Sequence, residues 1–216
     1  MELALDACGY IGTVAVFDGA TVVASREVVM RGEAEERLMP AVVDAVMAAG
    51  GWDRLSAVWV GGGPGSFTPL RLAASIAKGV ATARRLPLHA GSSLALAAAD
   101  PGLGDGRVAV ALDAMRGEVF VQLFERHGNS LGAPAPWQRV ARDAAVELAQ
   151  RAGARLLQLP VTGGEVRPHA AHFRLLHDAG LVMPVDLERW EPEYGRLAEA
   201  QVVWEARHGR PLSERP

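Results

Sequence analysis

The sequence predicts an α/β protein in which mixed sheets are flanked by helices. Three short strand patterns joined by tight turns open the chain, which indicates an antiparallel meander. A strand–helix–strand–helix pattern follows, which implies parallel pairing through right-handed crossovers. Half of the 216 residues are hydrophobic but only 6% are aromatic. The apolar content is mainly Ala, Val and Leu, which suits helices packed on sheets.

The meander strands are expected at Glu2–Ala7, Thr13–Phe17 and Thr21–Val29. Asp18-Gly19, between the last two of them, is a strong hairpin signal. A helix should follow, because apolar residues recur on one helical face from Ala34 to Ala49. Pro40 lies early in that pattern, where it either kinks the helix or marks its true start.

A glycine-rich segment lies at the centre of the next strand–loop–helix unit. Leu55–Gly61 is a continuous apolar strand of the buried, parallel type. Gly61–Pro69 contains the loop, and a helix is expected over Pro69–Arg84 with Thr68 as its N-cap. Two shorter elements follow, a strand at Leu86–His89 and a helix at Ser92–Ala99.

The segment Asp100–Gly106 is the clearest linker, because it combines Pro, Gly and Asp. It divides the chain into an N-terminal domain, 1–100, and a smaller C-terminal domain, 101–216. Both domains open with a strand that ends in an acid, Asp6 and Asp113, before a hairpin. The C-terminal elements are expected at Val108–Leu112, Glu118–Phe124, Ala141–Ala152, Leu156–Pro160 and Gly195–His208.

Charge and cysteine content restrict the class of function. The formal net charge is −3, with a pI of about 6.1, whereas a protein that grips nucleic acid alone usually presents a basic field. Any role with RNA therefore needs a partner. The single cysteine, Cys8, cannot form an internal disulfide. We expect a cytoplasmic protein without signal peptide or membrane helix, because the longest apolar stretch, Leu94–Ala99, is far too short to span a bilayer.

The glycine loop allows two interpretations. Its backbone N–H groups could cradle an anion at the start of the following helix, or the glycines could simply permit a tight turn. The segment is not a P-loop, because Lys78 lies well inside the helix and no Gly-Lys-Ser/Thr ends the loop. Ser66 also interrupts any dinucleotide-binding fingerprint. Residues Gly63, Pro64, Gly65 and Ser66 are thus loop-shaping or a possible anion site.

Other candidates each have a plainer structural role. Asp6 could meet a metal-bound phosphate or pin its turn by an Asx hydrogen bond, and Asp113 has the same ambiguity. Ser66, Ser92 and Ser93 have no evident general base, so capping and turn roles are favoured. No two histidines have the i, i+4 spacing of a helical zinc site, although His169 and His172 could share a helix face. We predict no metal site.

Small apolar residues form a stripe along the helix after the loop. This stripe either packs on the sheet or lets a helix of another chain approach closely. The residues alone do not separate the two possibilities. Its members are Leu70, Ala73, Ala74, Ala77 and Ala81.

The glycine block resembles a known family. Gly63-Pro64-Gly65-Ser66-Phe67-Thr68-Pro69-Leu70-Arg71, followed by Ala77-Lys78-Gly79, is similar to the Gly-Pro-Gly-Ser-Phe-Thr-Gly-Leu-Arg and Ala-Lys-Gly signature of the TsaB (YeaZ) family. That family is the partner subunit in threonylcarbamoyladenosine modification of tRNA. The resemblance extends over roughly residues 1–125. Further similar blocks are Glu36–Pro40, Leu86–Leu88, Ser92–Leu94 and Ala111–Phe120.

The resemblance implies an actin-like, RNase H-like fold with two subdomains, and a protein that binds and activates the catalytic subunit TsaD. TsaD carries a helical His-x-x-x-His metal site that this chain lacks. A third, TsaE-type ATPase subunit joins the complex, and tRNA is reached only through it. Isolated members form homodimers. No residue is expected to be catalytic and no cofactor is expected. The implied interface residues are Glu36, Leu38, Pro40, Leu70, Arg71, Ala74 and Lys78.

The chain departs from the family pattern at three places. Asp6-Ala7-Cys8 replaces Asp-Thr-Ser, Ala34-Glu35 replaces His-Ser, and Pro69 replaces a glycine. The first change removes hydroxyls that would help hold a phosphate, and the other two suggest a retuned partner surface. Two enzyme alternatives stay open: an ATP-dependent phosphotransferase that uses Asp6 and the loop, and a metallopeptidase of the same fold.

Overall fold

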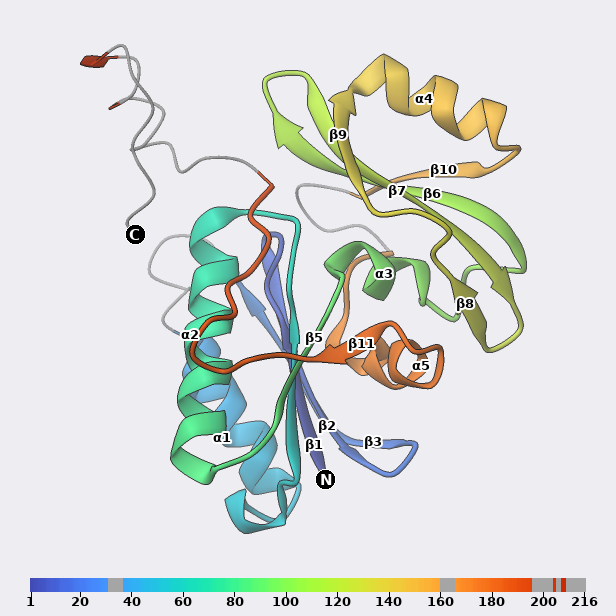
Figure 1. Cartoon of the computed structure of the whole chain (residues 1–216). Helices are drawn as coiled ribbons and strands as arrows, with labels where there is room; N and C mark the ends of the chain where they lie inside the picture. The colour runs from blue at the N-terminus through green and yellow to red at the C-terminus, as the bar shows by residue number, and fades with distance from the viewer. Residues whose placement is uncertain (31–36, 160–165, 196–203, 205–206, 209–216) are drawn as a thin grey trace.

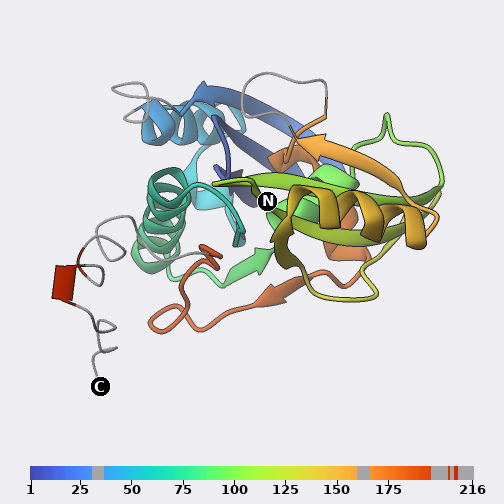
Figure 2. The same ribbon diagram turned by 90° about the horizontal axis from the view of Figure 1, so that it is seen from above.

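The computed structural model of the chain describes residues 1–30, 37–159 and 166–195, together with 204 and 207–208. Within that part, two sheets and five α-helices form alternating layers (Figure 1). Helices α1 (Leu38–Ala48) and α2 (Phe67–Arg84) lie side by side on one face of the first sheet (Figure 2). Helices α3 (Ser93–Ala98) and α5 (Phe173–Asp178) lie between the sheets, and α4 (Arg142–Arg151) covers the far face of the second.

The first sheet has the order β11-β5-β4-β1-β2-β3. Strands β1, β2 and β3 form the predicted antiparallel meander, and β4 and β5 join β1 in parallel. β11 pairs antiparallel with β5, so the chain returns to the first sheet near its C-terminal end. The bounds are β1 Glu2–Asp6, β2 Ile11–Asp18, β3 Thr21–Val29, β4 Ala57–Gly61, β5 Leu88–Gly91 and β11 Val182–Pro184.

The second sheet has the order β10-β6-β7-β8, and β9 also pairs with β7. β6 and β7 form a long antiparallel hairpin, whereas β10 joins β6 in parallel after α4. The predicted linker lies directly before this sheet. The bounds are β6 Gly106–Met115, β7 Glu118–His127, β8 Ser130–Gly132, β9 Gln138–Ala141 and β10 Arg155–Leu159.

Strand alternation divides the interior into separate apolar layers. In β1, Leu3 and Leu5 face α1 and α2, whereas Ala4 faces the central layer with α3. In β6, Val108 and Val110 join that central layer, and the alternate alanines face α4. The central layer is therefore shared by both sheets. Burial in this layer makes the two halves of the molecule one packed unit, while the boundary at residue 100 stays a prediction.

The start of each helix beside the first sheet is fixed by its first residues. α1 begins at Leu38, so Pro40 lies in its first turn, where the missing N–H breaks no helical hydrogen bond. The prediction that Thr68 caps α2 was wrong. The helix begins at Phe67 with Ser66 as N-cap, because Ser66 holds the extended conformation before the first turn.

The final predicted helix, Gly195–His208, falls almost entirely outside the described residues, as does the start of the first predicted helix. None of the described helices is both long and apolar enough to cross a membrane.

Neighbouring residues of α1 provide a test of how this helix is oriented. Leu38 is fully buried, whereas Met39 is 40% exposed. Leu38→Ala should lower the free energy of unfolding by about 2–5 kcal/mol, because it removes buried methyl groups and leaves a cavity. Met39→Ala should change it by about 0.5 kcal/mol or less. Urea denaturation of both variants measures the difference, and equal losses would contradict the orientation.

Candidate functional site

The strand ends around the glycine loop meet at a buried carboxyl group. Asp6 ends β1 and is only 1% exposed. Its Oδ1 accepts a hydrogen bond from the backbone N–H of Cys8 at 3.1 Å, and its Oδ2 accepts one from the Ser93 hydroxyl at 2.5 Å. Gly61 lies against this carboxyl so closely that an added Cβ would be 1.8 Å from Oδ2. Only glycine fits at that position.

Ser93 continues the network from the carboxyl group into the loop. Its Oγ accepts a hydrogen bond from the N–H of Gly63 at 3.2 Å, and its own N–H donates to the Gly63 carbonyl at 2.8 Å. The Gly63-Pro64 peptide bond is cis, and Gly63 has a φ of 95°. The loop is thereby tied to α3 by two hydrogen bonds at one residue.

The loop is also fastened to the chain after β1. The N–H of Ser66 donates to the Cys8 carbonyl at 2.8 Å, and a Cβ on Gly65 would be 2.4 Å from that oxygen. Gly62 donates its N–H to the Gly91 carbonyl at 2.8 Å. Because Gly62, Gly63 and Ser66 use their N–H groups inside the protein, these donors are not presented to an anion. The geometry supports the loop-shaping interpretation.

Burial controls the ionisation of both side chains at the end of β1. Desolvation raises the pKa of Asp6, although the hydrogen bonds from Ser93 and Cys8 act in the opposite direction. Desolvation and the neighbouring Asp6 raise the pKa of the Cys8 thiol well above its usual range. Cys8 is therefore a buried thiol rather than a reactive thiolate.

The other predicted polar candidates have structural partners. Asp113 accepts a hydrogen bond from Arg142 at 3.0 Å. Ser92 caps α3, as its Oγ accepts from the Ala95 N–H, and it donates to Gln122. His172 Nδ1 lies 2.8 Å from the Leu96 carbonyl oxygen, and burial lowers the pKa of this imidazole.

The histidine pair does not extend into a metal-ligand set. The rings of His169 and His172 lie 5.5 Å apart, and His169 Nε2 is 3.2 Å from a carboxylate oxygen of Glu27. In the described residues, no three His, Cys, Asp or Glu side chains converge as ligands.

The predicted interface residues differ in their exposure. Leu38, Leu70 and Ala74 are buried; Leu38 packs in the layer between the helices and the first sheet, and Leu70 packs in the central layer. Pro40 and Arg71 are exposed, and Lys78 is half-buried with its ammonium group donating to the Trp190 carbonyl at 3.0 Å. Glu36 lies outside the described residues, as does the Ala34-Glu35 departure, while Pro69 is buried in the first turn of α2.

Sequence reasoning missed the exposed apolar stripe of α1, which we call the α1 stripe. It consists of Met39, Val43 and Met47, with exposed fractions of 40%, 38% and 58%. A hollow of about 310 Å³ continues from Met39 onto α2. The spacing i, i+4, i+8 was visible in the sequence, but it was hidden beside a second apolar stripe that faces the sheet. The remaining residues around the hollow are Trp52, Ile76, Gly79, Val80, Ala83 and Arg84.

Removal of the Asp6 carboxyl tests the buried network. Asp6→Ala leaves the Ser93 hydroxyl and the Cys8 N–H without their acceptor, so the free energy of unfolding should fall by about 2 kcal/mol or more. Asp6→Asn keeps an acceptor oxygen and should lose distinctly less. Chemical denaturation compares the two, and equal losses would show that the hydrogen bonds are not what stabilises this point.

The raised pKa of Asp6 gives this network a pH dependence. Because the native state holds the Asp6 proton more tightly than the unfolded chain, the contribution is complete below the ordinary value of 3.8 and declines as pH rises through the native pKa. The stability of the protein relative to Asp6→Asn should therefore fall as the pH rises from about 4 through the native pKa. Paired urea titrations across this range measure it, and a constant or rising difference would contradict the direction.

Comparisons with known proteins place this arrangement in a family. A family model described as TsaD, tRNA N6-adenosine threonylcarbamoyltransferase, matches residues 29–181. The TsaB protein of Bacillus subtilis, named for tRNA threonylcarbamoyladenosine biosynthesis, is 28% identical over 94% of this chain and 96% of its own length. The protein of the same name from Escherichia coli is 34% identical over 60% of this chain and 57% of its own length.

A solved structure supports the same assignment. YeaZ from Pseudomonas aeruginosa superposes with a TM-score of 0.72 at 25% sequence identity, covering 89% of this chain and 98% of its own. This similarity confirms the predicted actin-like, RNase H-like fold. The chain therefore belongs to the threonylcarbamoyltransferase family that the matched model describes, and within it to the TsaB (YeaZ) proteins.

Proposed function

We propose that this chain is a non-catalytic, cytoplasmic partner subunit that binds and activates a TsaD-type subunit in threonylcarbamoyladenosine modification of tRNA. The observation that carries this proposal is the exposed α1 stripe beside the α2 hollow, on a chain whose TsaB relatives are named for this biosynthesis. Methionine and valine side chains exposed together on a helix mark a surface suited to another protein.

The proposed docking follows from the layer arrangement. α1 and α2 cover one face of the first sheet, and the C-terminal segment crosses α2, where Trp190 accepts a hydrogen bond from Lys78 (Figures 1 and 2). The α1 stripe is exposed on the described chain. Burial of the α1 stripe by equivalent helices of TsaD would remove apolar surface from water. If TsaD binds better in its active conformation, this association shifts its population toward that conformation. Activation then requires no chemistry from this chain.

The network at Asp6 supports a non-catalytic role. Its carboxyl group binds Ser93 and Cys8, and the loop donors that could hold a phosphate bind Cys8, Ser93 and Gly91. The N–H groups of Gly62, Gly63 and Ser66 are thus not available to a phosphate, which disfavours the phosphotransferase alternative. Among the described residues no three His, Cys, Asp or Glu side chains converge, which disfavours the metallopeptidase alternative. Calorimetry with ATP and magnesium and metal analysis of the purified protein test these two alternatives.

We propose that the interface residues named from the sequence contribute to docking in two ways. Pro40 and Arg71 are exposed and can contact a partner directly, whereas Leu38, Leu70 and Ala74 would act by holding the helices in place. The same face can pair with a second copy when TsaD is absent, which gives the homodimer. A TsaE-type subunit and tRNA join through the assembled complex.

Reconstitution tests the function itself. Purified TsaD and TsaE-type subunits, threonylcarbamoyl donor and tRNA should give modified adenosine only when this chain is added, as measured by nucleoside analysis. Modification that proceeds equally well without the chain would refute the proposed function.

A matched pair of substitutions tests the docking face. Met47 in the α1 stripe is 58% exposed, and Met183 on β11, the opposite edge of the sheet from β3, is 60% exposed. Met47→Glu should weaken binding to TsaD about tenfold or more, because it would bury a carboxylate without a counter-ion. Met183→Glu should leave binding unchanged. Titration calorimetry compares them, with melting temperatures as a check on folding; equal affinities would exclude the α1 stripe from the interface.

A further inference from the structure

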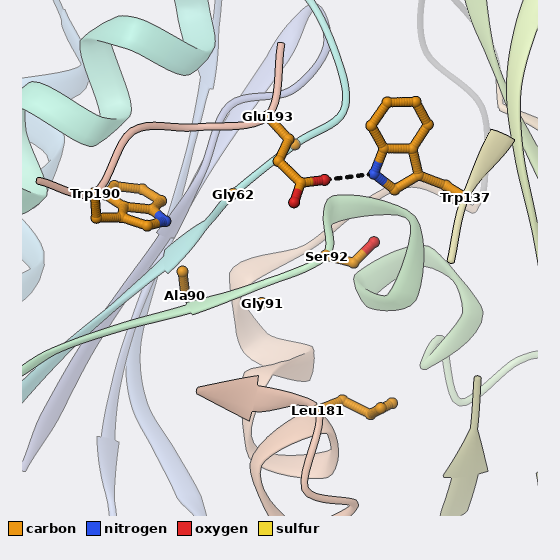
Figure 3. A pocket seen from close by; sticks show the side chains of 9 residues that line it. Gly62, Ala90, Gly91, Ser92, Trp137, Leu181, Trp190 and Glu193 are labelled. Carbon is orange, nitrogen blue, oxygen red and sulfur yellow. Dashed lines mark hydrogen bonds between the residues drawn. The ribbon is translucent and has the colours of Figure 1, made fainter. Parts of the chain in front are cut away.

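A second cavity lies away from the α1 stripe, where the two sheets approach each other. Its volume is about 180 Å³, which is room for about six water molecules at liquid density. Figure 3 shows Trp190 and Trp137 on opposite sides of it, with Glu193 between them. The lining residues are Gly62, Gly63, Ala90, Gly91, Ser92, Trp137, Leu181, Trp190 and Glu193.

The C-terminal segment 190–193 builds one wall of this cavity and is held in place at several points. The N–H of Glu193 donates to the Gly62 carbonyl at 2.8 Å, and the Trp190 carbonyl accepts from Lys78 at 3.0 Å. From the other subdomain, the indole N–H of Trp137 donates to Glu193 Oε2 at 2.6 Å. The cavity therefore needs the first sheet, the loop before β9 and the C-terminal segment together.

Glu193 determines the electrostatic character of the cavity. It is the one charged residue among the nine that line it. Its Oε2 accepts the hydrogen bond from Trp137. Its other oxygen is turned toward the cavity and accepts no hydrogen bond from the described residues (Figure 3). Ser92 Oγ is already engaged by Gln122 and Ala95. The lining thus offers a carboxylate oxygen and no cationic side chain.

We propose that this cavity binds a small organic cation, a guanidinium or alkylammonium group on an apolar stem. The free carboxylate oxygen would accept a charge-assisted hydrogen bond, and the indoles of Trp137 and Trp190 would attract the cation and cover its stem. An anionic ligand such as a nucleotide phosphate would meet Glu193 without a counter-charge. The cation can come from a free amine or guanidine, or from an arginine or lysine side chain of a partner protein.

The test uses the indole N–H signal of Trp137, assigned by its loss in Trp137→Phe. Butylguanidinium added to the ¹⁵N-labelled full-length protein should shift this signal saturably, with a dissociation constant of about 1 mM or below. Butylurea has the same shape without the charge and should bind about tenfold or more weakly. Both ligands are compared on the unchanged protein, and the variant serves only to assign the signal.

Two variants that are close in the sequence provide the second measurement. Glu193→Gln keeps an acceptor for Trp137 but removes the charge, so the affinity for butylguanidinium should fall about tenfold or more. Glu188→Gln removes an exposed charge that does not line the cavity and should bind as the unchanged protein does. Equal affinity for butylurea, unchanged affinity in Glu193→Gln, or the absence of a saturable shift would overturn the proposal.

A further arm separates the two sources of the cation. A capped Gly-Arg-Gly peptide presents the guanidinium as a protein would. Tighter binding of the peptide than of butylguanidinium indicates a partner's arginine, and the reverse order indicates a free small cation. Either order supports the cavity as a cation site.

Discussion

The buried carboxyl group of Asp6 is the point on which the rest of the structure depends. Through Cys8 and Ser93 it joins the end of β1, the start of α3 and, by way of Gly63, the loop before α2. A buried polar group of this kind must be fully hydrogen-bonded to be tolerated, and the closeness of Gly61 shows that the backbone packs directly against it.

This internal network has a consequence for the outer surface. Because the loop is fixed to β1 and α3, the start of α2 is fixed with it, and α2 supports the hollow beside the α1 stripe. The position of the proposed docking face therefore depends on hydrogen bonds that lie in the interior of this chain. The second cavity uses the opposite side of the same loop, where Gly62 and Gly63 meet the C-terminal segment. The glycine loop thus lies between the helices of the proposed docking face and the cavity proposed to bind a cation.

Much of the architecture could be predicted because the local patterns agree with the tertiary structure. The hairpin at Asp18-Gly19, the apolar strand before the glycine loop and the acid at the end of β1 appear where expected. The prediction that Asp113 ends its strand was wrong, because β6 continues in the ladder to Met115. The α2 cap was misplaced because Thr68 and Ser66 have similar capping propensity, and only the extended backbone of Ser66 decides between them. The pairing of β11 with β5 joins residues far apart in sequence, which local patterns do not encode.

The sequence by itself determined the family block, the α/β class and the lack of a basic field for RNA, since these depend on residue identity and spacing. Which side of a helix faces outward was decided by tertiary packing. Leu38 and Ala74 are buried, whereas Met39 and Met47 are exposed, although all four are apolar. Tertiary packing also decided the partner of Glu193. Its carboxylate accepts the hydrogen bond from Trp137 only because the C-terminal segment folds back onto the first sheet. Contacts of this kind depend on the positions of whole elements, which residue type and periodicity leave open.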